Sequence, residues 1–146
     1  MKKETKEYIT GAVIGFAIGA IFFGKLVFGA QISEGERDLI AATIEAEAAY
    51  EPLEGKIMIA EVILNRTENE NFPDTVAGVI QAEGQFSTWE NGQIQKVITS
   101  PQDYEAVKLA LKKEDREPVY FFRNKHYGCG KPWKHVGNHY FSTLSE

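Results

Sequence analysis

The chain has 146 residues, of which 43% are hydrophobic and 25% are charged, and its formal net charge is −5. This length allows one domain of ordinary size, and the balance of apolar and charged residues argues against wholesale disorder. The single Cys excludes a fold stapled by disulfides within the chain, and the net negative charge argues against a nucleic-acid partner.

The N-terminal segment, residues 1–32, has the composition of a membrane anchor or a signal segment. Residues 8–30 carry a single charge, Lys25, and as a helix they would span roughly 35 Å, enough to cross a bilayer core. The lysines that precede them predict a cytoplasmic N-terminus and an extracytoplasmic domain. We favour a retained single-pass anchor, because Phe28 stands where a signal-peptide cleavage site needs a small residue. A cleaved signal, or a segment later released from the membrane, would instead give a secreted protein.

Gly11, Gly15 and Gly19 recur every four residues in this segment and share one face of the expected helix. Small residues in this pattern let two transmembrane helices approach closely, so self-association through this face is one expectation. The other interpretation is a weakly hydrophobic segment that is simply rich in Gly and Ala.

A capping box marks the first helix of the following domain, residues 33–146, because Ser33 and Glu36 have the Ser-x-x-Glu spacing. We expect this helix over residues 34–49. Pro52 should end it and open a second helix over 53–65. The second helix is apolar on almost every side, which is typical of a helix buried at the centre of a domain.

A short third helix is expected near Asp74, followed by a loop over residues 81–99. Ser100 and Pro101 then supply an N-cap and a first helical residue. The inward positions of that last helix are predicted to be Tyr104, Val107 and Leu111.

The apolar period changes near the C-terminus and predicts strands over residues 119–123 and 136–142. The expected fold class is therefore α+β, with a helical body, a small C-terminal β-hairpin, and one transmembrane helix before them.

Glu47 lies on the apolar face of the first helix. At 100° per residue it falls roughly 20° from Ile40, whereas Glu45 points to the opposite, solvated side. Burial raises the pKa of a carboxyl and keeps it protonated near neutral pH, as a general acid requires. The alternative is a Glu near a helix end that reaches water or caps a backbone group.

The residues around Glu47 in the sequence offer the groups of a carbohydrate site. Glu51 and Glu54 make the next loop acidic, and Gln85, Phe86 and Ser87 place an amide, a ring and a hydroxyl in one loop. Sugar-binding sites pair such groups with flat aromatic surfaces, which the C-terminal section supplies, although some of its rings would form the hairpin core. These aromatic residues are Tyr120, Phe121, Phe122, Tyr127, Trp133, Tyr140 and Phe141.

A set of short motifs occurs in a defined order along the domain. They are Glu47-Ala48, Glu51-Pro52, Glu54-Gly55 and residues 62–66, 72–76, 84–87 and 137–141. Each motif is weak alone, but the ordered set resembles the SleB/CwlJ family of bacterial cell wall hydrolases, the spore cortex-lytic enzymes. The resemblance covers essentially the whole domain.

The resemblance implies a lysozyme-like catalytic domain that acts on peptidoglycan glycan strands without a metal or a cofactor. The essential carboxylate of the family maps onto Glu47. The resemblance implies that the domain cleaves the MurNAc–GlcNAc β-1,4 bond as a lytic transglycosylase, with Glu47 as its single general acid and base. The expected substrate-binding residues are Glu51, Glu54, Gln85, Phe86, Ser87, Tyr120, Phe122, Asn124 and His139.

A hydrolytic muramidase is one alternative, because a second carboxylate beside Glu47 could activate water. Glu51, Glu54 and Glu61 are the candidates for that role. A non-catalytic, membrane-anchored protein that binds the wall or a partner is another alternative, and it would tolerate loss of Glu47.

Two further alternatives involve Cys129. This residue and the histidines His126, His135 and His139 are ligand types at spacings reminiscent of zinc motifs, though irregular ones. A Cys–His peptidase is less favoured, because Cys129 lies between two glycines, where nothing obvious lowers its pKa.

Positive charge gathers in the C-terminal section, where residues 118–145 contain no Asp or Glu. Its basic residues are Arg123, Lys125, Lys131 and Lys134. They would either face an anionic wall polymer or simply be solvated hairpin charges.

Overall fold

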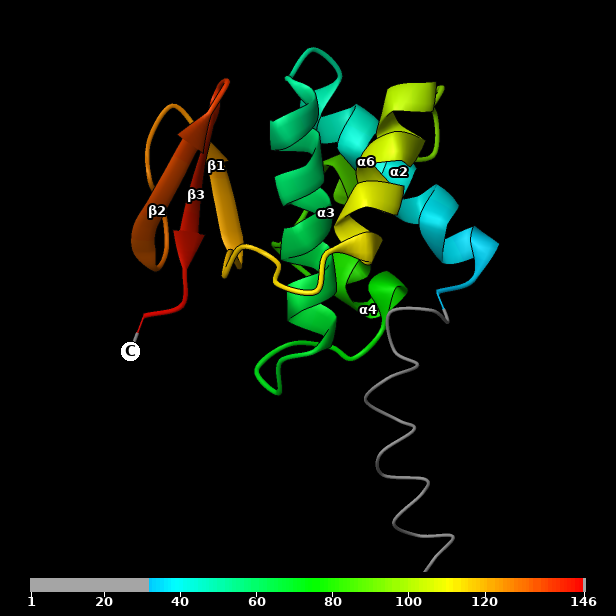
Figure 1. Ribbon diagram of the computed structural model, residues 1–146. Helices are drawn as coiled ribbons and strands as arrows, with labels where there is room; N and C mark the ends of the chain where they lie inside the picture. The colour runs from blue at the N-terminus through cyan, green and yellow to red at the C-terminus, as the bar shows by residue number, and fades with distance from the viewer. Residues whose placement is uncertain (1–31, 146) are drawn as a thin grey trace, which may run out of the picture. The chain divides into compact units, whose positions relative to one another are not determined.

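The computed structural model describes residues 32–145 (Figure 1). The expected membrane anchor, its glycine face and any self-association through it lie outside these residues. Within residues 32–145, no helix is both long and apolar enough to cross a membrane.

The helical body contains five helices in the described part of the chain. They are α2 (Glu34–Ala48), α3 (Leu53–Thr67), α4 (Val76–Gln81), α5 (Ser87–Glu90) and α6 (Pro101–Lys112). The capping box predicted at Ser33 is present, and the predicted N-cap Ser100 also forms a capping box, with Asp103. These two residues fix where α2 and α6 begin. Helix α5 lies in the segment where a loop was predicted.

Helix α3 is the centre of the body. Most of its residues are buried, and it packs against α2, α4 and α6 on one side and reaches β1 on the other. Figure 1 shows it standing between the sheet and the remaining helices. The sequence predicts this position, because a helix that is apolar all round needs neighbours on every side.

The buried stripe of α6 differs from the prediction. Asp103 lies inside, fully buried, and its carboxylate accepts a hydrogen bond from Lys56 Nζ at 2.7 Å. This buried ion pair turns Tyr104 outward, where the ring is 41% exposed and its hydroxyl donates to Asp38 at 3.0 Å. The prediction that Tyr104 faces inward is therefore wrong, because apolar periodicity does not identify a buried charge that has a partner.

Glu45 was expected in water, but it lies beside this ion pair. Its carboxylate is 3.9 Å from Lys56 Nζ, and its side chain is only 21% exposed. Packing against both α3 and α6 buries a wider face of α2 than its apolar stripe indicates. Burial and the neighbouring Asp103 raise the pKa of Glu45.

The C-terminal section forms a three-stranded antiparallel sheet in the order β1-β3-β2, rather than a two-stranded hairpin. Its strands are β1 (Phe121–Asn124), β2 (Lys131–Val136) and β3 (His139–Thr143). The expected pairing of the first and last strands is present, with Phe121 opposite Ser142. Strand β2 is an edge strand of mostly exposed residues with a bulge between Pro132 and Lys134, so it lacks the apolar alternation of a buried strand.

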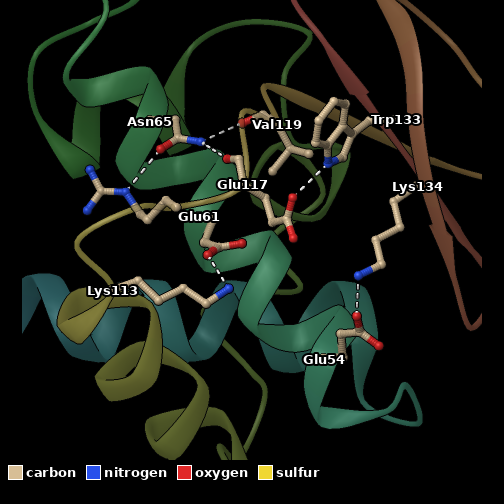
Figure 2. A network of polar contacts seen from close by, with 9 residues as sticks. Glu54, Glu61, Asn65, Lys113, Glu117, Val119, Trp133 and Lys134 are labelled. Atoms are coloured by element: carbon tan, nitrogen blue, oxygen red, sulfur yellow. Dashed lines mark hydrogen bonds and ion pairs between the residues drawn. The ribbon is translucent and has the colours of Figure 1, made fainter.

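Polar contacts join the sheet to the helical body (Figure 2). The Nδ2 of Asn65 on α3 donates to the carbonyls of Glu117 and Val119 at 2.8 and 2.9 Å. From β2, Trp133 Nε1 donates to the Glu117 carboxylate at 2.8 Å, and Lys134 pairs with Glu54 at 2.5 Å. Sheet and helices therefore hold a fixed relative position in the described domain.

Candidate active site

A cleft of about 410 Å³ lies where α2 and α3 meet β1, β3 and the segment around residues 84–87. Its walls come from both the helical body and the sheet. The lining residues are Glu47, Arg66, Gly84, Gln85, Ser87, Phe121, Phe122, Arg123, Asn124, Gly128, Cys129, His139 and Ser142.

Glu47 reaches this cleft from the last turn of α2. The Oγ1 of Thr88 on α5 donates a hydrogen bond of 2.5 Å to Glu47 Oε1, which fixes the carboxyl in place. Burial raises the pKa of Glu47, and the Thr88 hydrogen bond opposes this rise only in part. The carboxyl is therefore suited to carry a proton closer to neutral pH than an exposed Glu.

His139 lies at the cleft and is 2% exposed. Burial lowers its pKa and favours the neutral ring, while nearby Glu51 works in the opposite direction. Glu51 Oε2 is 4.0 Å from His139 Nδ1. The imidazole also meets the edge of the Phe122 ring, with 5.4 Å between centroids.

Glu51 does not line the cleft, and it fixes the turn that precedes His139 instead. The backbone N–H and side-chain amide of Asn138 donate to its carboxylate at 2.9 and 2.7 Å. Burial alone would raise the pKa of Glu51, but these hydrogen bonds outweigh it and the pKa is lowered. An ionised Glu51 thereby ties the β2–β3 turn to the loop between α2 and α3.

The structure gathers six of the expected site residues in one cleft, namely Glu47, Gln85, Ser87, Phe122, Asn124 and His139. The other four lie elsewhere. Glu51 holds Asn138, Glu54 pairs with Lys134, Phe86 is buried behind Phe122, and Tyr120 stacks on Phe72. Of the basic residues in the C-terminal section, Arg123 lines the cleft.

Arg66 is the main cleft residue that the sequence reasoning missed. Only 5% of it is exposed, and its guanidinium lies 5.2 to 5.7 Å from the ring centroids of Phe72, Phe86 and Phe121. Its Nε donates to the Tyr120 carbonyl at 2.8 Å. The available signal was Arg66 in the last turn of a helix that is apolar on almost every side, because an Arg on such a helix is rarely buried without a partner.

Within residues 32–145, no three His, Cys, Asp or Glu side chains are arranged to hold a metal ion. His126 is exposed, and His135 stacks on Tyr140 at 4.0 Å between ring centroids.

Comparison with known proteins connects this geometry to a family. The Cell Wall Hydrolase family model matches residues 50–142, beginning three residues after Glu47. The spore cortex-lytic enzyme of Oceanobacillus iheyensis is 36% identical over 118 residues. That alignment covers 75% of this chain and 42% of the relative, so the chain spans less than half of the relative's length.

Two solved structures share the fold. The catalytic domain of the Bacillus cereus SleB protein matches with a TM-score of 0.68 and 28% identity, over 78% of this chain and 94% of that domain. The catalytic domain of the germination-specific lytic transglycosylase SleB from Bacillus anthracis matches with a TM-score of 0.69 and 26% identity. That match covers 78% of this chain and 98% of the domain. These findings confirm the resemblance to the SleB/CwlJ family.

Proposed function

The chain belongs to the Cell Wall Hydrolase family, and from this we propose that it cleaves the MurNAc–GlcNAc β-1,4 bond of peptidoglycan as a lytic transglycosylase. Glu47 is the single general acid and base in this proposal. The chain is also proposed to be tethered to the membrane by residues 1–32, with its lysozyme-like domain in the wall.

One observation carries the mechanism. Glu47 is the single acidic residue among the described residues that line the cleft. The carboxylates considered for a second role are engaged elsewhere, because Glu51 accepts from Asn138, Glu54 pairs with Lys134, and Glu61 pairs with Lys113 at 2.7 Å (Figure 2). A hydrolase that uses two carboxyl groups needs the second one roughly 5–10 Å from the first, so that the two flank the scissile bond. A mechanism with one carboxyl fits this cleft better.

The reaction uses the raised pKa of Glu47 twice. Protonated Glu47 donates its proton to the glycosidic oxygen, and the bond from that oxygen to C1 of MurNAc breaks with its electron pair on the leaving sugar. The resulting carboxylate then accepts the proton of the MurNAc C6 hydroxyl, whose oxygen bonds to C1 and closes a 1,6-anhydro ring. Glu47 ends protonated, so the cycle needs neither water nor a second catalytic group.

Polar groups along the cleft are proposed to position the sugar rings. Gln85, Ser87 and Asn124 offer amides and a hydroxyl, while Phe122 offers a ring, as expected for carbohydrate recognition. His139, held near Glu51, adds a neutral imidazole to the same wall.

Replacing Glu47 by Gln tests the proposal directly. The amide can still accept the Thr88 hydrogen bond but has no proton to give, so we expect clearing of purified cell walls to fall by about a hundredfold or more. Turbidity loss measures the rate, and circular dichroism checks that the fold remains. E70Q is the matched control, because Glu70 is exposed and does not line the cleft.

The products separate the two enzymatic mechanisms. Mass spectrometry of wall digested by the unchanged chain should find anhydro-MurNAc ends. Reducing MurNAc ends alone would replace the transglycosylase by a hydrolytic muramidase. Full clearing by E47Q would show that Glu47 is not the general acid and would overturn the proposed mechanism, whereas no clearing by the unchanged chain would favour the non-catalytic alternative.

A further inference from the structure

Buried polar atoms without a hydrogen-bond partner gather at the cleft. In the described residues, such atoms belong to the side chains of Glu61, Arg66, His139 and Ser142. Glu61 has the Lys113 ion pair, and the other three residues all line the cleft. Buried polar groups in folded proteins are nearly always satisfied by protein, water or a ligand, so three groups without a protein partner mark this cleft as a place where a polar ligand can bind.

Among these three residues, Arg66 places the narrowest limit on the ligand, because a buried guanidinium needs an anionic partner. Its Nε is bonded to the Tyr120 carbonyl, but its Nη1 has no partner. No acidic side chain in residues 32–145 forms an ion pair with it. The three surrounding phenyl rings stabilise the cation in part, yet a buried guanidinium without an anion is rare.

Hydrogen bonds fix the position of the Arg66 side chain in the cleft. Its Nε bond to Tyr120 joins it to the strand pairing, because the Tyr120 backbone N–H donates to the Ser142 carbonyl at 2.9 Å. Burial lowers the pKa of Arg66 to about 10, while nearby Cys129 works in the opposite direction, so the side chain stays charged near neutral pH. The cleft therefore contains a fixed, desolvated positive charge with the Ser142 hydroxyl on the same lining.

We propose that Arg66 binds a carboxylate of the substrate, with Ser142 Oγ as a further hydrogen-bond donor in the cleft. This inference rests on the proposed function and adds a preference for anionic glycan to it. Charge in the cleft supports it, because Arg66 and Arg123 outnumber Glu47, whereas the chain as a whole is acidic. A charge-assisted hydrogen bond from a guanidinium to a carboxylate is roughly twice as strong as a bond between neutral groups.

Peptidoglycan offers a carboxylate from two sources. One is on the peptide stem. The other is the lactyl carboxylate of muramic acid, which is free only where no stem is attached, because the stem otherwise joins it as an amide. Three probes distinguish them: N-acetylmuramic acid carries the lactyl carboxylate, muramyl dipeptide carries the stem carboxylate, and N-acetylglucosamine carries neither. Chemical-shift titration of the full chain in detergent measures each dissociation constant. We expect at least one acid to bind about tenfold or more tightly than N-acetylglucosamine.

Variants assign this preference to Arg66. R66Q should reduce it to about twofold or less, and R66K should restore part of it, because Lys keeps the charge without the planar fork. R37Q is the matched control, since Arg37 is an exposed arginine of α2 that does not line the cleft. Circular dichroism melts show whether each variant is folded. If R66Q unfolds, R66K carries the assignment, and equal binding of the three probes by the unchanged chain would still overturn the site.

Equal binding of all three probes by the unchanged chain would overturn the carboxylate site, and so would an undiminished preference in folded R66Q. Either result leaves the proposed function standing if the chain still releases anhydro-MurNAc from walls. Preferential binding by a chain that releases no cleaved glycan would support the site and contradict the proposed function.

Discussion

Glu47 and Glu45 are separated by one residue on α2, yet their surroundings differ. Glu47 accepts from a neutral hydroxyl in the cleft, while Glu45 lies near the buried Lys56–Asp103 pair. Helical geometry identifies Glu47 as the carboxyl of interest, but it does not reveal the ion pair beside Glu45. That pair joins α3 and α6, and contacts between distant segments leave no local pattern in the sequence.

Replacing Thr88 by Val should change the pH dependence of activity. The Thr88 hydroxyl stabilises the ionised form of Glu47, so its loss should raise the pKa of Glu47 further. The first proton transfer requires protonated Glu47. The alkaline limb of the kcat/KM profile should therefore shift to higher pH.

T99V is the control for this shift, because Thr99 bonds to Tyr104 and does not line the cleft. Rates of wall clearing across pH provide the measurement for both variants. An alkaline limb that stays in place in T88V would show that another group sets it.

At the scale of elements, helix ends with side-chain caps were predictable and unmarked elements were not. The Ser33 capping box marks the start of α2 in the sequence, and the N-cap Ser100 followed by Pro101 marks the start of α6. Helix α5 has four residues and follows Phe86, which provides no side-chain cap, so its sequence looks like a loop. The consequence reaches the site, because α5 supplies the Thr88 partner of Glu47.

The β2–β3 turn immediately precedes His139, so its contact with Glu51 determines where His139 lies. Gly137 has φ +58°, and a Cβ there would collide with the Glu51 carboxylate. G137A should therefore break the Glu51–Asn138 hydrogen bonds as well as strain the backbone. We expect a loss of about 2–4 kcal/mol in the free energy of unfolding, measured by chemical denaturation.

Gly92 provides the matched control, because it has φ +76° and the nearest atom to an added Cβ is 3.9 Å away. G92A carries the backbone strain without the collision, so its loss should be smaller, about 1 kcal/mol. Equal losses in the two variants would mean that the Glu51 contact contributes little stability.

At the scale of the whole molecule, the cleft needs both parts of the domain. Helix α2 supplies Glu47 and α3 supplies Arg66, while β1 and β3 supply Phe122 and His139. The sequence predicted a helical body followed by strands, and it placed Glu47 on a buried face. It did not predict that Glu54 pairs with Lys134 and lies outside the cleft, because this contact depends on strand β2, which was not recognised in the sequence.

The proposed tether concerns the complete chain. Residues 8–30 carry one charge, and basic residues precede them, so we expect the full chain in the membrane fraction with residues 33–146 accessible to external protease. The double variant I14K/I18K should leave that fraction, because each Lys at the centre of a span costs about 2.5–3.5 kcal/mol.

I98K is the matched control for the tether, because Ile98 is 90% exposed in the described domain and a Lys there should not alter location. Immunoblots of carbonate-washed membranes compare the variants. The intact mass of the recovered chain distinguishes an anchor from a signal segment. A chain that begins near residue 31 and is recovered in the medium would contradict the tether and indicate a secreted enzyme. Glu47 would then reach glycan strands by diffusion, and not only the strands close to the membrane.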